Sequence, residues 1–240
     1  MSTDRSALAD LEAEIVSCFR CPRLVAWREA IALEKVKRFR DEPYWGRPLP
    51  GFGDPDGRIL IVGLAPAAHG GNRTGRVFTG DASGDFLWAA LHRAGLADRA
   101  SSRRADDGLT LTDVRIAAAV RCAPPANKPT IDERDTCAPF LARELRLLTS
   151  VRVIVALGAF GWDATLRVLT QDGHLPATAG LCPAPASPRS AASHPKAPSA
   201  STTRTELSSA ISRTRNGAQV SRSRIVGLFA GGAQRTAAAM

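Results

Sequence analysis

The chain has 240 residues, of which 44% are hydrophobic and 23% are charged, and this balance excludes a disordered chain, a collagen and a minimal disulfide scaffold. Its 32 basic and 23 acidic residues give a net charge of +9, which favours a polyanionic partner, with nucleic acid ahead of an anionic membrane surface. The sequence shows no signal-like apolar run at its start and no stretch apolar enough to span a bilayer, so we expect a cytoplasmic protein with reduced cysteines. A monomer is the default expectation.

The first 57 residues predict two helices and a loop. Residues 2–18 have an amphipathic pattern, and Ser2 or Thr3 is expected to cap that helix. Residues 22–40 predict a second helix whose basic end complements the helix dipole. Residues 41–57 are rich in Pro and Gly and predict a loop.

Short apolar runs then alternate with helical patterns. The predicted strands are residues 58–63, 114–120 and 151–157, and the predicted helices are residues 84–95, 131–148 and 160–170. Thr130 and Glu133 have the spacing of a capping box. Alternation of this kind predicts an α/β fold with a short, mainly parallel sheet.

The composition changes near residue 175. Residues 175–240 are rich in Ala, Ser and Thr, contain one aromatic residue, and show no sustained periodic pattern before residues 224–228. We therefore expect an α/β domain over residues 1–174 and an irregular tail over 175–240, with any last strand of the sheet in doubt. A shift of reading frame, or disorder, would explain such a tail.

Four of the five cysteines form a candidate metal site. Cys18 and Cys21 are a C-x2-C pair, and Cys122 and Cys137 are a second pair, whereas Cys182 lies in the tail. Four thiolates suit either zinc or a 4Fe–4S cluster, and the spacing does not separate the two. The alternative is a set of unrelated buried thiols.

The loop of residues 63–81 leaves the carboxyl end of the predicted strand 58–63, where α/β sheets bind ligands. Small residues, Ala67 among them, allow a ligand to approach the backbone. Arg73 and Arg76 are candidate phosphate contacts, and Phe78 offers a face on which a base can stack. The loop contains neither a dinucleotide-binding glycine pattern nor a Walker motif.

Two polar residues have two interpretations each. Asp81 precedes a predicted helix, so it is either its N-cap or a carboxylate that points into the cleft. Asn127, on the loop after the second strand, either caps a turn or uses its donor and acceptor to read a base.

Long motifs of the chain resemble those of the family 5, or b-type, uracil-DNA glycosylases. The similar stretches are GLAPAAHGGNRTGRVFTGD, RCAPPANKP, CFRCPRLVAWRE, PYWGRPLPGFGDP and VALGAFGWDA, and they lie within residues 11–170. The resemblance implies a three-layer α/β/α sandwich and an enzyme that hydrolyses the N-glycosidic bond of uracil, and of other deaminated bases such as hypoxanthine, in DNA. It thereby implies a role in base-excision repair.

The resemblance also implies roles for individual residues. Phe78 would stack on the flipped base, Asp81 would be the catalytic acid residue, and Asn127 would be its partner in the second motif. The four cysteines at positions 18, 21, 122 and 137 would bind a structural 4Fe–4S cluster, so the resemblance favours iron over zinc.

The last motif of that family, of the type His-Pro-Ser-x-x-Asn, is degraded here. His194 lies where the family has its histidine, but Ser199 replaces the asparagine, and a chance His-Pro pair is the alternative. His69 and His174 are weaker candidates for the same role. A second functional hypothesis is therefore an iron–sulfur protein that binds DNA with impaired catalysis, and a third is a zinc-stabilised nucleic-acid-binding module.

Overall fold

A computed structural model describes residues 4–173 and the backbone of residues 224–228 and 234–238. Within these ranges one sheet has the strand order β1-β3-β2-β4-β5-β6. The strands are β1 Phe52–Gly53, β2 Ile59–Gly63, β3 Val114–Ala118, β4 Val153–Leu157, β5 Arg224–Leu228 and β6 Gln234–Ala238. Strands β3, β2, β4 and β5 pair in parallel, whereas β1 and β6 pair antiparallel at the two edges. The predicted mainly parallel sheet is thereby confirmed.

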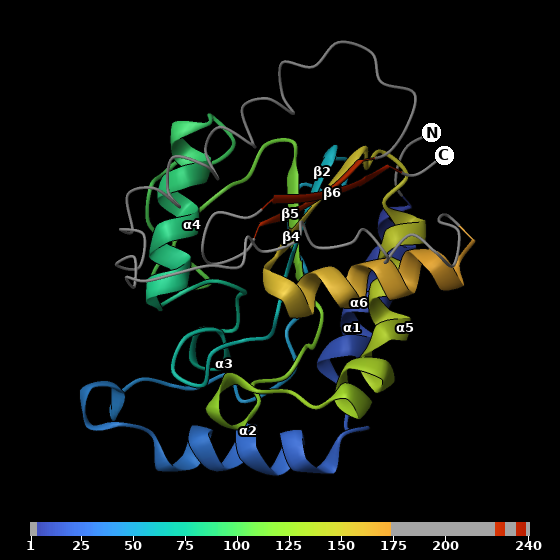
Figure 1. The fold of residues 1–240 in the computed structure, drawn as a ribbon. Helices are drawn as coiled ribbons and strands as arrows, with labels where there is room; N and C mark the ends of the chain where they lie inside the picture. Colours follow the sequence, from blue (N-terminus) through green and yellow to red (C-terminus); the bar gives the residue numbers. More distant parts are fainter. Residues whose placement is uncertain (1–3, 174–223, 229–233, 239–240) are drawn as a thin grey trace, which may run out of the picture.

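Helices cover both faces of the sheet. The helices are α1 Arg5–Val16, α2 Pro22–Glu34, α3 Gly71–Thr74, α4 Ala82–Arg93, α5 Ile131–Leu147 and α6 Gly158–Gln171, with short 3₁₀ turns at Lys37–Phe39 and Pro125–Asn127. Figure 1 shows α4 on one face of the sheet, α1, α5 and α6 on the other, and α2 with α3 beyond one end of the strands. This is the predicted three-layer sandwich.

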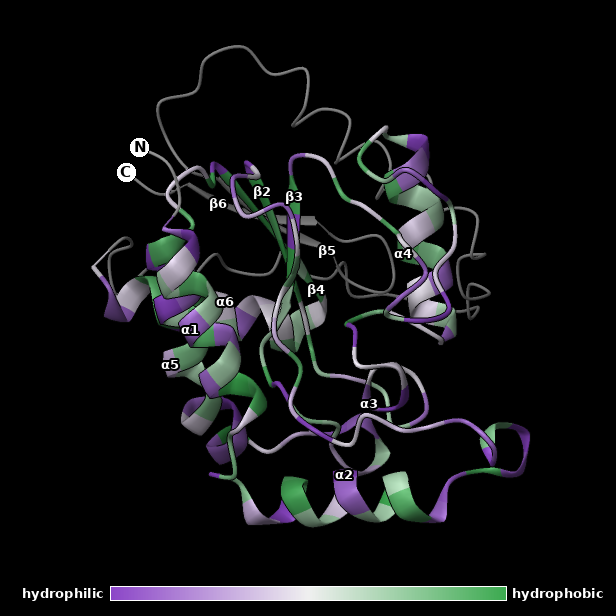
Figure 2. Cartoon of the chain, turned by 180° about the vertical axis from the view of Figure 1, so that it is seen from behind, coloured by the Kyte–Doolittle hydropathy of each residue, from purple (hydrophilic) through white to green (hydrophobic). Residues whose placement is uncertain are grey.

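The continuous apolar run of β2 reflects its position at the centre of the sheet. All five of its residues are buried, because both faces are covered. Ile59 and Ile61 pack on the α4 side with Trp88, and Leu60 and Val62 pack on the opposite side, where α5 and α6 lie. In Figure 2, β2 is accordingly drawn in the green of hydrophobic residues.

The segment expected to be an irregular tail contributes two strands. β5 pairs with β4 over five residues from Arg224 to Leu228, and β6 pairs with β5. The last parallel strand, which the sequence left in doubt, is therefore present in the sheet. Residues 174–223 lie outside the described residues, so a frame shift or disorder of the tail stays a prediction.

Two details of the N-terminal helices differ from expectation. Asp4 caps α1 by accepting hydrogen bonds from the amides of Ser6 and Ala7, so the expected cap at residues 2 and 3 was wrong. Helix α2 ends at Glu34 because Lys35 has a φ of 51°, and the basic stretch after it forms a separate 3₁₀ turn. The prediction that these cations complement the dipole of a helix running to residue 40 was therefore also wrong.

The start of α5 and the end of α4 match the sequence signals closely. Thr130 and Glu133 form the predicted capping box at the start of α5. Gly95, with a φ of 68°, follows the end of α4 as predicted. Among the described residues, no helix is both long and apolar enough to cross a membrane.

Candidate active site and cysteine cavity

The loop after β2 folds back so that Phe78 lies over the end of the strand. A methyl group placed on Gly63 would come within 2.6 Å of the ring atom Cζ of Phe78, so glycine is needed there. Trp88 fixes the loop from α4 by donating from Nε1 to the Phe78 carbonyl at 2.7 Å. Phe78 has a φ of 51°, an uncommon conformation for an aromatic residue that concentrates at functional sites. The half-buried ring therefore packs on Gly63, while the hydrogen bond from Trp88 holds the backbone of Phe78.

Asp81 serves as a helix cap and also faces the loop. Its Oδ1 accepts a hydrogen bond from the amide of Gly84 at 2.9 Å, which makes it the N-cap of α4. Its Oδ2 lies against Gly70, because a methyl group on that glycine would sit 2.2 Å from the oxygen. The two interpretations of Asp81 from the sequence are thus compatible, since one carboxylate oxygen caps the helix and the other is available to the site.

We expect Gly70→Ala to misplace this carboxylate. The new methyl group would sit 2.2 Å from Oδ2 of Asp81 and would displace it. Activity should fall much more than the melting temperature, which is checked by measuring both on the same preparation. Equal activity of Gly70→Ala and the wild type would contradict this placement of Asp81.

The two arginines of the loop are buried, which corrects the expectation that they meet phosphates. Arg73 is 7% exposed, forms an ion pair with Glu42, donates to the His69 carbonyl at 2.8 Å and stacks on the Phe39 ring. Arg76 is 5% exposed and forms an ion pair with Asp107 at 2.6 Å. Both guanidinium groups therefore support the loop from within.

Ala67 marks the turn before α3. Its carbonyl accepts hydrogen bonds from the amides of Gly70 and Asn72 at 3.2 and 3.1 Å, and its side chain is half-buried. The expectation that it lines the base pocket stays a prediction.

Asn127 lies on the loop that leaves β3, beside the loop that leaves β2. Because β2 and β3 are adjacent and parallel, both loops emerge from the same edge of the sheet. Ala126 and Asn127 have φ values of 52° and 55°, so two consecutive residues adopt the left-handed conformation. The Asn127 side chain is exposed, as a residue that contacts a ligand requires.

Of the three candidate histidines, the structure describes one. His69 precedes Gly70 on the site loop, and its Nδ1 lies 3.2 Å from the Tyr44 hydroxyl. Burial, with help from the charges of Arg38 and Arg73, lowers the pKa of His69, so the ring is neutral at pH 7. His174 and His194 lie outside the described residues. Residues 41–57 were predicted to be a loop from their Pro and Gly content, but no signal in the sequence indicated that Tyr44 contacts the site loop.

The four predicted ligand cysteines line one cavity, beyond the active-site edge of the sheet. Cys18 and Cys21 come from the turn before α2, Cys122 from the loop after β3, and Cys137 from α5. Burial raises the pKa of Cys122 to about 11 and that of Cys137 to about 12, so as free thiols these two groups stay protonated at neutral pH. A metal centre with net positive charge would reverse that preference.

The donor set of this cavity suits an iron–sulfur cluster. A 4Fe–4S cluster places each of four thiolates on a different iron atom, and four cysteines line one cavity here. In the described part of the chain, no three His, Cys, Asp or Glu residues are grouped so as to hold one ion.

The second motif is tied to the cysteine-bearing turn. Arg23, in the first turn of α2, donates to both oxygens of Glu133 at 2.7 Å. It also donates to the Lys128 carbonyl at 3.2 Å, next to Asn127. The position of α2 is thereby coupled to the loop that carries Asn127.

Comparison with known proteins decides the family. The family model described as the uracil DNA glycosylase superfamily matches residues 50–215, and a type-5 uracil-DNA glycosylase of Mycobacterium leprae is 56% identical over 169 residues, which cover 70% of this chain and 74% of that protein. The chain belongs to the type-5 uracil-DNA glycosylases. The resemblance that the motifs indicated is thereby confirmed.

Other type-5 and type-4 uracil-DNA glycosylases also match. The Thermus thermophilus type-5 protein is 58% identical over 152 residues, or 63% of this chain and 68% of that protein. A type-5 protein of Mycobacterium tuberculosis is 56% identical over 168 residues, which cover 63% of that protein. A type-4 protein of Pyrobaculum aerophilum is 34% identical over 163 residues, 68% of this chain and 66% of that protein. The superfamily match continues to residue 215, so it includes the segment with His194.

Proposed function

We propose that this chain is a monofunctional glycosylase that hydrolyses the N-glycosidic bond of uracil in DNA and so initiates base-excision repair. The observation that carries the proposal is that Asp81 and Phe78 lie on the same loop after β2, with one carboxylate oxygen of Asp81 outside the helix cap. A flipped base needs an apolar face on which to stack, and the reacting sugar needs a nearby anion.

The residues of the site supply the chemistry in a simple order. Phe78 stacks on the extruded base, and Asn127 reads its edge with one donor and one acceptor. Cleavage builds positive charge on the sugar, which the Asp81 carboxylate stabilises while it positions water. The water oxygen bonds to C1′, and the electron pair of the broken bond leaves with the base, which takes up a proton.

A histidine would help the base to leave by donating to its carbonyl oxygen. His194 is the candidate that the family resemblance favours, and His69 is the alternative that the described residues place on the site loop. When Tyr44 donates to Nδ1 of His69, the ring proton is on Nε2 and can be donated.

The test is release of free uracil from an oligonucleotide that contains one uracil, at enzyme excess and without added nucleotide or metal ion. We expect single-turnover release that leaves an abasic site, and slower release from the same oligonucleotide with hypoxanthine. An oligonucleotide with thymine at that position is the control. Absence of release from both deaminated substrates would contradict the proposal.

A DNA-binding protein with impaired catalysis is the second candidate. The observation that favours it is the degraded motif at His194, where Ser199 replaces the family's asparagine. A gel-shift assay beside the release assay separates the two functions, because this alternative binds DNA with an abasic site without releasing a base.

We also propose a cytoplasmic monomer, in keeping with cysteines that must stay reduced.

We propose that a 4Fe–4S cluster is held by Cys18, Cys21, Cys122 and Cys137. The cluster supplies no step of the hydrolysis. Its role is structural, because it would connect three parts of the chain: the turn before α2, the loop after β3, and helix α5. Protein purified without oxygen is expected to be brown, with broad absorbance near 400 nm and about four iron atoms per chain. Cys137→Ala should lose the colour, whereas Ser17→Ala, next to the first ligand, should keep it. A colourless, zinc-loaded protein would contradict the cluster and favour the zinc-stabilised module.

A further inference from the structure

A buried arginine of α2 points at the cysteine cavity. Arg28 is 1% exposed, and its Nη1 donates to the Sγ of Cys122 and to the carbonyl of Cys18, both at 3.1 Å. Its Nε and Nη2 are also buried, and neither has a hydrogen-bond partner among the described residues. The nearest carboxylate contact is with Glu29, at 3.6 Å and half exposed. Two donors of a buried cation therefore remain unused.

The side chains that line the cavity favour an anionic occupant. Its lining consists of the four cysteines, three arginines at positions 20, 28 and 121, and neutral residues, with no Asp or Glu among them. Arg121 is paired with Glu144, yet its Nε and Nη1 are buried without hydrogen-bond partners in the described structure. A buried cation without full compensation destabilises the folded state, so an anionic occupant would stabilise it.

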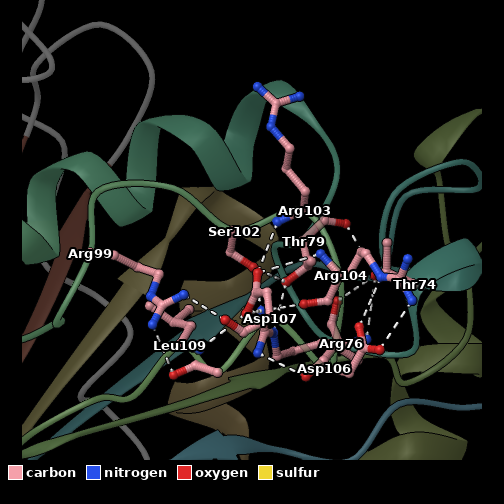
Figure 3. A network of polar contacts seen from close by, with 12 residues as sticks. Thr74, Arg76, Thr79, Arg99, Ser102, Arg103, Arg104, Asp106, Asp107 and Leu109 are labelled. Atoms are coloured by element: carbon pink, nitrogen blue, oxygen red, sulfur yellow. Dashed lines mark hydrogen bonds and ion pairs between the residues drawn. The ribbon is translucent and has the colours of Figure 1, made fainter.

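Arg76 is a buried arginine in which every guanidinium nitrogen has a hydrogen-bond partner, and it serves as a comparison for Arg28. Figure 3 shows Arg76 within a network of polar contacts. Nε donates to Thr79, Nη1 to the Ala105 carbonyl, and Nη2 to Asp107 and the Arg104 carbonyl, so each nitrogen has a partner. Unused donors at Arg28 are therefore a property of the cysteine cavity and not of buried arginines in this fold.

We propose that Arg28 binds the sulfur atoms of the iron–sulfur cluster and raises its reduction potential. The inference rests on the proposed cofactor. A cluster held by four thiolates is a net anion, and hydrogen bonds and charges around the sulfur atoms set its potential. Reduction adds one electron and makes the cluster more negative, so a buried guanidinium stabilises the reduced form more than the oxidised form.

The test compares the clusters of four full-length proteins prepared without oxygen: wild type, Arg28→Met, Arg28→Lys and Arg76→Met. Each is titrated with dithionite through redox mediators, and the reduced cluster is followed by electron paramagnetic resonance. At one fixed potential, the ratio of reduced to oxidised cluster should fall at least tenfold in Arg28→Met, which equals about 59 mV for one electron. Arg28→Lys keeps the charge and should stay closer to the wild type.

Arg76→Met is the matched control because it also removes a buried guanidinium, and it should lower thermal stability without changing the potential. An unchanged potential in Arg28→Met would overturn the role of Arg28 and leave the cluster itself standing. A wild-type protein without a cluster would instead overturn the cofactor, and the inference with it. If Arg28→Met cannot retain a cluster, retention by Arg28→Lys supports the proposal, and equal loss in both variants overturns it.

Discussion

Replacing Asp81 by Asn should slow uracil release about 10²–10³-fold, the usual cost of removing one preorganised electrostatic group from an active site. The carboxylate is the group that the structure places at the loop after β2, with Oδ2 against Gly70 and Oδ1 on the amide of Gly84. Asparagine is nearly isosteric with aspartate and caps helices equally well, so the helix should survive while the negative charge is lost. The measurement is the single-turnover rate constant on the uracil oligonucleotide.

Asp81→Ala separates the cap from the charge. Alanine removes both, so it should also lower the free energy of unfolding by about 1 kcal/mol, whereas Asp81→Asn should leave it nearly unchanged. Asp85→Asn, on an exposed position of the first turn of α4, is the control for loss of a carboxylate near the site. Wild-type rates in Asp81→Asn would mean that Asp81 serves only as the helix cap.

The largest effect on stability is expected at Glu144. This carboxylate is 1% exposed and bridges two buried arginines, Arg115 of β3 at 2.8 Å and Arg121 at 2.5 Å. Glu144→Gln would leave two buried cations without their shared anion, which costs about 3–5 kcal/mol. Urea unfolding monitored by circular dichroism measures the loss. Glu12→Gln is the matched control, because Glu12 is the more exposed partner of Arg115 and should cost at most about 1 kcal/mol.

The same carboxylate should make the fold sensitive to acid. Burial by itself raises the pKa of Glu144, but the charges and hydrogen bonds of Arg121 and Arg115 outweigh it and hold the pKa below the ordinary 4.5. A group with a lowered pKa in the folded state stabilises that state above its unfolded pKa, and the contribution disappears as the pH falls through the folded pKa. The difference in stability between wild type and Glu144→Gln should therefore be constant above about pH 5 and shrink in stronger acid. A difference that grows on acidification would contradict this account.

Local signals in the sequence predicted the parts of the fold that depend on neighbouring residues. The apolar run of β2 indicated a central strand because burial on both faces needs no alternation, and Thr130 with Glu133 fixed the start of α5. The helix cap at Asp81 was predicted correctly because it depends on residues of the same loop and helix, and the catalytic role of Asp81 stays a prediction. Phe78 was placed on that loop as well, but its position over Gly63 depends on the path of the chain back to the strand.

Non-local pairing explains what the sequence did not predict. From the sequence, Arg73 and Arg76 were expected to contact phosphates. In the fold, each guanidinium is instead bound by an acidic residue about 31 positions away, Arg73 by Glu42 and Arg76 by Asp107. The contacts of Glu144 and Arg28 were not predicted from the sequence, because their partners come from other elements. Two-residue strand β1 is too short for any periodic pattern, and β5 was recognised only as a short apolar run until its register with β4 was known.

The separation of the cysteines along the chain has a consequence for how the protein is made. More than a hundred residues lie between Cys21 and Cys137, although both line the same cavity. At a synthesis rate of ~5–20 residues per second, the first two thiols emerge at least about 5 s before the last one. During that interval Cys18 and Cys21 are an incomplete set of the ligands of the proposed cluster, and they can be oxidised or can capture a stray metal ion. The yield of protein with the proposed cluster should therefore depend on the cell's supply of reductant during synthesis, and not only on its supply of iron.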